Sequence, residues 1–145
     1  MSLKIIKIKY IKDDMEKIVQ IDKGDWIDLR TAEDIFLEPG EYKLIPLGIA
    51  MALPPNYEAL LIPRSSTFKK YGVIQTNSIG LIDETYCGDN DEWLFPVYAT
   101  RAVFIPKNTR ICQFRILKHQ PTVAFAEVDH LSETDRGGFG STGGK

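Results

Sequence analysis

The sequence has few cysteines, no excess of one charge and no long apolar run. Cys87 and Cys112 are the only cysteines among 145 residues, too few for a disulfide framework and too far apart for a zinc site. The 18 Lys and Arg residues against 20 Asp and Glu residues give a net charge of −2. This balance excludes a chain-wide basic field for duplex nucleic acid, so we expect no nucleic-acid partner.

No stretch reaches the roughly 18 consecutive apolar residues that a transmembrane helix requires, so we expect no membrane partner. The first ten residues, MSLKIIKIKY, are basic, but lysines interrupt every apolar stretch, unlike in a secretory signal peptide. With 43% hydrophobic residues and little net charge, the chain has the composition of a folded protein. These features predict a soluble protein of the reducing cytoplasm.

Apolar side chains recur mainly with a period of two, the pattern of β-strands with one buried face. Ile6, Ile8 and Tyr10, for example, alternate with lysines. Further strand-like runs, separated by turn-forming residues, lie at 42–45, 59–62, 93–98, 102–105 and 122–126. The pattern predicts one all-β domain, a sandwich, jelly roll or barrel, with one short helix near 66–71 that two serines could cap.

The C-terminal segment differs from the rest in composition. Five of the eight residues 137–144 are glycine. Glycine has no side chain to bury and loses much backbone entropy on ordering, so we expect this segment to be mobile unless something binds it. We therefore divide the chain into a β-barrel domain at 1–131 and a flexible C-terminal arm at 132–145.

One candidate for phosphate binding lies at 62–67. Here a strand-like run ends in Arg64, Ser65 and Ser66. The guanidinium fork matches phosphate oxygens, and the hydroxyls and free N–H groups of a helix start add neutral donors. A capped turn with a solvated arginine would give the same pattern, so this segment alone leaves both interpretations open.

A second candidate lies at 77–88, where an apolar stretch ends in Asp83, three residues before Tyr86. A hairpin of this type could offer backbone groups to a flat heterocycle while the carboxylate holds a water molecule. An ordinary hairpin with a solvated aspartate and a core tyrosine fits the pattern equally well.

Two further elements are weaker. The glycines of the arm could wrap phosphates with backbone N–H groups while Phe139 stacks on a base, but a frayed chain end has the same composition. Arg110 and Gln113 lie three apart on a strand-like run. With a period of two they point to opposite faces, unless a bulge intervenes.

Together these segments resemble, in order and over almost the whole chain, the five motifs of the homotrimeric dUTP diphosphatases (dUTPases). The matching stretches are 26–29 with 39–41, then 63–66, 80–88, 110–113 and 136–143. The resemblance implies a jelly-roll-like β-barrel that assembles as a homotrimer, with three active sites at subunit interfaces and a C-terminal arm closing over each nucleotide. It further implies hydrolysis of dUTP to dUMP and diphosphate, with Mg²⁺ on the triphosphate.

The same resemblance implies roles for single residues. Asp83 matches the catalytic aspartate that orients and deprotonates the attacking water, and Asp28 matches the acid that supports the metal through its waters. Tyr86 would pack on the deoxyribose and leave no space for a 2′-hydroxyl. The full set matched to substrate binding is Arg64, Ser65, Ser66, Asn77, Gly80, Leu81, Ile82, Tyr86, Arg110, Gln113, Arg136, Phe139, Gly140, Ser141 and Thr142, of which Arg110 is expected to be structural.

The fifth motif departs from the family pattern. Arg136 runs directly into Gly-Gly-Phe, where the family usually has two more residues in between. Either Arg136 or Phe139 is therefore displaced from its usual place. Trp93 or Phe95, which follow the Tyr86 hairpin, could then supply the ring that stacks on uracil.

Two other functions stay open at this stage. A dCTP deaminase would have the same fold, but related deaminases lack the full Gly-Phe-Gly-Ser-Thr-Gly tail that stands at 138–143. A non-catalytic, nucleotide-binding regulatory trimer would be favoured by loss of Asp83 or Arg64, and both are present.

Overall fold

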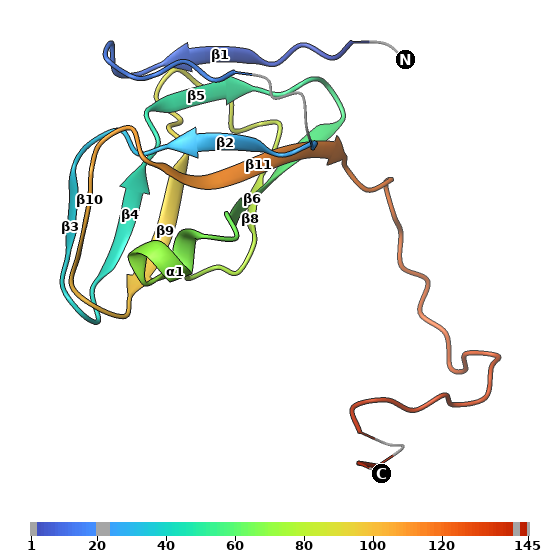
Figure 1. The fold of residues 1–145 in the computed structure, drawn as a ribbon. Coiled ribbons are helices and arrows are strands. Elements are labelled where there is room, and N and C mark those ends of the chain that lie inside the picture. Colours follow the sequence, from blue (N-terminus) through green and yellow to red (C-terminus); the bar gives the residue numbers. More distant parts are fainter. Residues whose placement is uncertain (1–2, 20–23, 141–142, 145) are drawn as a thin grey trace.

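The computed structural model describes residues 3–19, 24–140 and 143–144, which contain eleven strands and one short helix (Figure 1). The elements, in chain order, are β1 Lys7–Tyr10, β2 Ile27–Arg30, β3 Ile35–Leu37, β4 Tyr42–Pro46, β5 Ile49–Ala52, β6 Tyr57–Pro63, α1 Thr67–Tyr71, β7 Val73–Gln75, β8 Gly80–Ile82, β9 Leu94–Ala99, β10 Val103–Ile105 and β11 Arg110–Lys118. The prediction of an all-β protein with one short helix is confirmed.

The strands form antiparallel sheets that together make a jelly-roll-like barrel. The two larger sheets have the orders β2-β11-β6-β8 and β4-β9-β7, and the pairs β1-β5 and β3-β10 complete the structure. Strand β6 lies between β11 and β8, and this order determines which candidate residues become neighbours (Figure 1). The jelly-roll-like fold expected from the sequence is therefore confirmed.

The core is formed by inward-facing residues of these sheets. Every second residue of β9 is buried, as the period-two pattern predicts for a strand with one covered face. The rings of Trp93 and Phe114 meet edge to face, with centroids 5.2 Å apart and planes at 75°. Trp93 and Phe95 are fully buried, so the suggestion that either ring stacks on uracil is wrong: both belong to the core.

The helix α1 begins after Ser66, but the Ser66 side chain makes no capping hydrogen bond. The neighbouring Thr67 fixes this turn instead, because its buried hydroxyl accepts the Arg64 N–H at 2.9 Å and donates to the Ile111 carbonyl at 2.8 Å. The turn that carries Arg64 is thereby attached to β11. Within the described part of the chain, no helix is long and apolar enough to cross a membrane.

The strand expected at 122–126 is absent. Val123 and Phe125 alternate as strand residues do, yet Phe125 is 96% exposed and the segment has no strand assignment. In this single chain the segment runs away from the barrel, so it has no sheet edge with which to pair its backbone (Figure 1). Because β11 ends at Lys118, the part outside the sheets starts well before residue 132, and the domain boundary after residue 131 remains a prediction.

Candidate active site

Asp83 lies at the end of β8, where the chain turns into a hairpin. Its Oδ1 accepts the Thr85 N–H at 2.8 Å, and its carbonyl accepts the Tyr86 N–H at 3.0 Å. The hydrogen bond from Thr85 lowers the pKa of the exposed Asp83 carboxyl below its ordinary value. Since an ordinary aspartate already titrates near pH ~3.9, this carboxylate is ionised at neutral pH and able to accept a proton.

Tyr86 is fixed across the same hairpin, because its hydroxyl donates to the Glu92 carbonyl at 2.7 Å. Burial is the main cause that raises the pKa of Tyr86, so the phenol stays protonated and keeps this bond. Asp83 and Tyr86 line one open pocket of about 400 Å³, together with Leu81, Ile82, Thr85, Glu92 and Leu94. The structure thus places the expected acid and the expected sugar-packing ring in one pocket.

The apolar residues before Asp83 are placed by β8, which pairs with β6. Gly80 is buried, and a Cβ there would lie 3.1 Å from the Leu61 Cβ, a tight contact for which Leu61 would have to shift by a few tenths of an ångström. Leu81 is 66% exposed, whereas Ile82 is half-buried. Asn77 lies exposed in the turn before β8.

Arg64, directly after β6, is held by a carboxylate from another strand. Its Nε lies 3.1 Å from Oδ1 of Asp28 in β2, and its Nη1 donates to the Arg110 carbonyl at 3.3 Å. Ser65 beside it is exposed and Ser66 half-buried. Arg64 and Ser65 also line a second open pocket, of about 480 Å³, between the end of β6 and β7. This pocket has the cation and hydroxyl donors that a phosphate requires.

A β-bulge brings Arg110 and Gln113 to the same carboxylate. The register of β11 against β2 shifts between Arg110 and Cys112, and Gln113 then stands opposite Asp28. Residues directly opposite each other on paired strands point to the same face of the sheet, so Gln113 and Asp28 share a face. The Arg110 Nη1 lies 3.6 Å from the Asp28 Oδ2. The Gln113 amide donates to the Pro63 carbonyl at 3.1 Å, next to Arg64. The four side chains form one polar cluster, which we call the Asp28 cluster.

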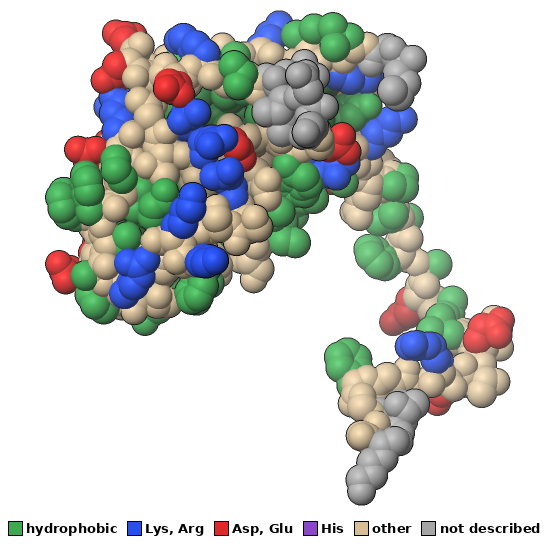
Figure 2. Space-filling view, viewed as in Figure 1, with side chains coloured by type: hydrophobic (Ala, Val, Ile, Leu, Met, Phe, Trp, Pro, Cys, Tyr) green, Lys and Arg blue, Asp and Glu red, His purple; other side chains and the backbone are tan. Residues whose placement is uncertain are grey.

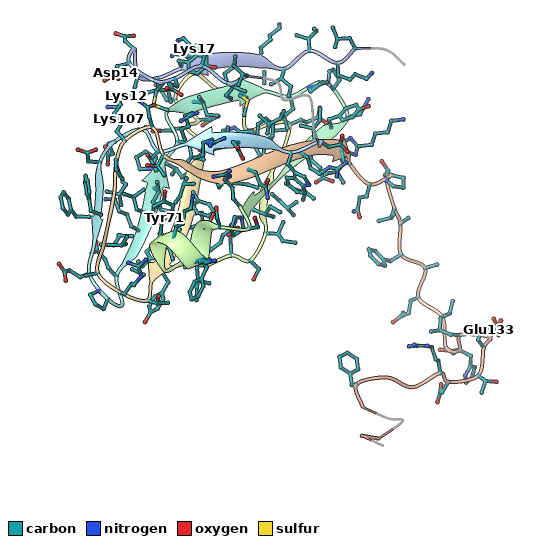
Figure 3. All side chains as sticks on the ribbon, in the orientation of Figure 1. Lys12, Asp14, Lys17, Tyr71, Lys107 and Glu133 are labelled. Atoms are coloured by element: carbon teal, nitrogen blue, oxygen red, sulfur yellow. The ribbon has the colours of Figure 1, made fainter. Side chains whose placement is uncertain are left out.

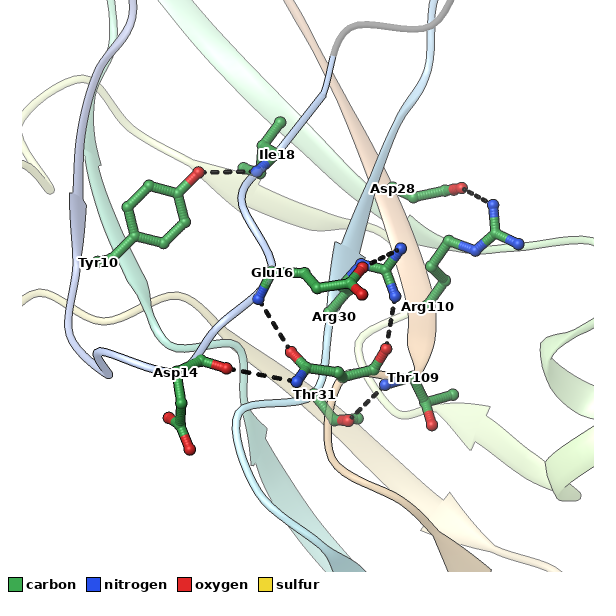
Figure 4. A network of polar contacts seen from close by, with 10 residues as sticks. Tyr10, Asp14, Glu16, Ile18, Asp28, Arg30, Thr31, Thr109 and Arg110 are labelled. Carbon is green, nitrogen blue, oxygen red and sulfur yellow. Dashed lines mark hydrogen bonds and ion pairs between the residues drawn. The ribbon is translucent and has the colours of Figure 1, made fainter.

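An N-terminal loop that the sequence analysis did not single out packs beside this cluster (Figure 4). In that loop Glu16 forms an ion pair with Arg30 of β2, with Nη2 and Oε2 2.9 Å apart, and Arg30 also donates to the Asn108 carbonyl at 2.6 Å. A small cavity of about 60 Å³ separates the loop from Asp28 and Arg110. Residues so far apart in sequence carry no shared motif, so only the fold could associate them.

The Asp83 pocket and the Asp28 cluster lie at opposite ends of β6 within one chain. Ile82, which precedes Asp83, pairs with Ala59, and Arg64 lies five residues beyond Ala59. Because the strands are antiparallel, Asp83 lies level with Glu58, six residues from Arg64. At about 3.3 Å per strand residue, this places Asp83 roughly 20 Å from Arg64 along the sheet. A single chain therefore does not bring the expected water-activating acid to the expected phosphate-binding arginine.

The arm residues are likewise apart from both groups. The chain extends away from the barrel after β11, and Figure 3 shows Glu133 of the arm far from labelled barrel residues such as Tyr71. Arg136, Phe139 and Gly140 are exposed, and Phe139 has a left-handed φ of 53°. Ser141 and Thr142, also expected to bind phosphate, lie outside the described residues.

Basic side chains gather on the face over β2, β11 and α1, where the Asp28 cluster lies (Figure 2). Arg64 and Arg110 contribute two cations there against the one carboxylate of Asp28. The excess of positive charge suits a polyphosphate.

The chain is similar to known proteins over almost its whole length. A family model described as dUTPase matches residues 26–143. The SPbeta prophage-derived deoxyuridine 5′-triphosphate nucleotidohydrolase YosS of Bacillus subtilis (strain 168) is 59% identical over 140 residues, covering 97% of this chain and 99% of that protein. The deoxyuridine 5′-triphosphate nucleotidohydrolase of Gloeothece citriformis (strain PCC 7424) is 37% identical, and the alignment covers 99% of this chain and 97% of that protein.

Solved structures show the same fold at lower identity. The Staphylococcus bacteriophage 80alpha dUTPase G164S mutant with dUpNHpp superposes with a TM-score of 0.78 at 20% identity, covering 96% of this chain and 98% of that one. The dUTPase from Streptococcus mutans gives a TM-score of 0.71 at 20% identity, covering 81% and 98%. Motif order, fold and close relatives lead to one conclusion: the chain belongs to the dUTPase family.

Proposed function

We propose that this chain hydrolyses dUTP to dUMP and diphosphate by attack of a water molecule on the α-phosphorus. The observation that carries the proposal is the ionised Asp83 at the rim of a pocket shared with Tyr86. Asp83 orients the water in line with the phosphorus and takes its proton. The chain's membership of a family whose relatives are deoxyuridine 5′-triphosphate nucleotidohydrolases supports this role.

The nucleoside is recognised by the hairpin. Main-chain groups between Asn77 and Asp83, including those of Gly80, Leu81 and Ile82, pair with the edge of uracil. Cytosine reverses the donor and acceptor pattern there, and each unsatisfied buried polar group costs about 1–3 kcal/mol. Tyr86, fixed through Glu92, packs on the deoxyribose and excludes a 2′-hydroxyl.

The phosphates are held by the Asp28 cluster and the adjacent serines. Arg64, Ser65, Ser66 and Gln113 donate to phosphate oxygens. Arg110 acts mainly through Asp28, because both arginines of the cluster are oriented by that carboxylate. Phosphoryl transfer depends chiefly on positioning and charge stabilisation, which such a set supplies.

We include Mg²⁺ in the proposal, held mainly by the substrate. Within the described ranges, no three His, Cys, Asp or Glu side chains group into a metal-binding cluster. Both carboxylate oxygens of Asp28 already face an arginine, Arg64 or Arg110. The hydrogen bonds that these oxygens can still accept therefore suit the water ligands of a metal ion rather than direct coordination of the ion. This donor set fits Mg²⁺, which usually keeps several waters and takes substrate phosphates as ligands. When bound, the ion would neutralise charge on the triphosphate.

The complete site is assembled from copies of the chain in a homotrimer. The separation of roughly 20 Å along β6 supports this, because one dUTP must reach both groups. One chain provides Asp83 and Tyr86, a neighbour provides the Asp28 cluster, and the arm of the third closes the site. Arg136, Phe139, Gly140, Ser141 and Thr142 then cover the nucleotide and exclude water.

The shared site can be tested by mixing two inactive variants. Arg64→Ala and Asp83→Asn chains should each have little activity alone. In trimers reassembled from equal amounts, about a quarter of the sites combine an intact Arg64 with an intact Asp83 and recover turnover. The unmixed variants and the double variant are the controls. A mixture no more active than its parents would place the whole site within one chain.

A cytoplasmic location is part of the same proposal. Cys87 and Cys112 are both free, the first exposed and the second buried. Free thiols are typical of reducing compartments, in which disulfides seldom persist.

The activity is tested by two product assays on the same protein. Diphosphate release from dUTP, with Mg²⁺ supplied, is the expected result, and ammonia release from dCTP is not expected. Ammonia without diphosphate would identify a deaminase of the same fold. Nucleotide binding without either product would favour the non-catalytic regulatory trimer.

A further inference from the structure

A junction of three segments lies beside Asp83 and joins Glu84, within the third motif, to two residues outside the five motifs. Glu84, the next residue, accepts the Asn56 N–H at its Oε2, 3.0 Å away. Its Oε1 lies 3.6 Å from the Nε2 of His119. His119 in turn donates its backbone N–H to the Asn56 carbonyl at 3.0 Å. The contacts form a closed triangle, which we call the Glu84 junction.

The Glu84 junction joins parts of the chain with different tasks. Glu84 belongs to the hairpin of Asp83, and Asn56 lies in the turn before β6, where it holds a left-handed φ of 70°. His119 follows the last residue of β11 and is the first residue of the segment that leaves the barrel (Figure 1). From 120 to 140 every residue is exposed. The junction therefore lies at the base of the arm, where the exposed segment 119–131 that leads to the arm leaves the barrel.

The ring of His119 lies between two acceptor groups. Its Nδ1 lies 2.8 Å from the Gln120 carbonyl, and its Nε2 lies 3.6 Å from the Glu84 carboxylate. The first is a hydrogen bond, and the second is a longer polar contact. The imidazole thus lies against the hairpin that bears Asp83.

We propose that Glu84 and His119 are positioning residues that hold the base of the C-terminal arm against the hairpin of Asp83. The proposal rests on the proposed function, because it assumes that the arm closes over a nucleotide whose water is activated by Asp83. An arm whose base is already held against the barrel loses less conformational entropy on closing than an arm whose base is free. Loss of the junction thus weakens closure and raises KM, while kcat, measured on closed complexes, stays the same.

The test compares Glu84→Gln and His119→Gln with a variant that places a cation opposite Glu84 and with a matched control. Glu84→Gln keeps an oxygen for the Asn56 N–H but removes the charge. His119→Lys supplies the cation. His130→Gln makes the same substitution at the other histidine, an exposed position between the junction and the arm. Amide hydrogen exchange at residue 119 and the steady-state KM and kcat for dUTP are measured for each trimer.

Both junction variants should show exchange at residue 119 about two- to fivefold faster and a KM higher by a similar factor, the effect expected from losing one partly exposed polar contact. kcat should not change. In His119→Lys the exchange rate at residue 119 and KM should both return toward the wild-type values, and His130→Gln should change neither. If the amide of residue 119 exchanges equally fast in the wild type and in both junction variants, the contact between Glu84 and His119 does not hold this part of the chain. If exchange is faster but KM is unchanged, the two residues have no positioning role for the arm. Because exchange is independent of activity, an inactive wild type would refute the proposed function alone.

Discussion

Replacing Asp83 with asparagine is expected to lower the turnover of dUTP about 100-fold or more, the usual effect of losing a general base. Asparagine retains an Oδ1 that can accept the Thr85 N–H, so the hairpin should keep its shape. Its amide takes no proton, so the water is still held but no longer deprotonated. Single-turnover measurements with dUTP and titration with a non-hydrolysable analogue should show a slow chemical step with almost unchanged affinity.

Asp89→Asn is the matched control for this variant. Asp89 is an exposed carboxylate on the same hairpin, and its partner is Lys9, with Nζ and Oδ1 3.9 Å apart. The same change of charge at this position should leave turnover within about twofold, since exposed ion pairs contribute little. Normal turnover in Asp83→Asn, or an equal loss in Asp89→Asn, would remove Asp83 from the role of base.

Deleting residues 132–145 is expected to abolish most of the activity, by about 100-fold or more, and to leave the fold intact. Residues 132–140 are exposed throughout, so their removal takes no buried surface from the barrel of the single chain. The loss of activity follows because the arm would supply the backbone donors that wrap the phosphates and exclude water. The midpoint of thermal unfolding should move by no more than about 2 °C.

Two measurements separate a closing arm from a structural one. Deletion of residues 144–145 alone should preserve turnover, which controls for a changed chain end. Circular dichroism and sedimentation of the longer deletion should match those of the wild-type protein. A deletion that unfolds or dissociates the protein would mean that the arm is part of the assembled core.

The fold class and the separate site segments could be predicted from the sequence because both depend on local patterns. The period of two indicated strands that the structure has, such as β6 and β9. It failed at 122–126, because a strand requires a partner edge as well as alternation. The suggestion that Trp93 or Phe95 could stack on uracil failed for a related reason: nearness in sequence to Tyr86 does not say whether a ring is buried in the core.

The order of motifs along the chain, by itself, determined the family and the candidate residues, since phosphate and uracil recognition use short segments whose residue types can be read directly. Only the tertiary structure decided how those segments are related. The bulge in β11 brings Arg110 and Gln113 to Asp28, the register of β8 on β6 separates Asp83 from Arg64, and Glu84 meets His119 from 35 positions away. Strand register and long-range contacts are set by packing of the whole barrel, and no local pattern contains them.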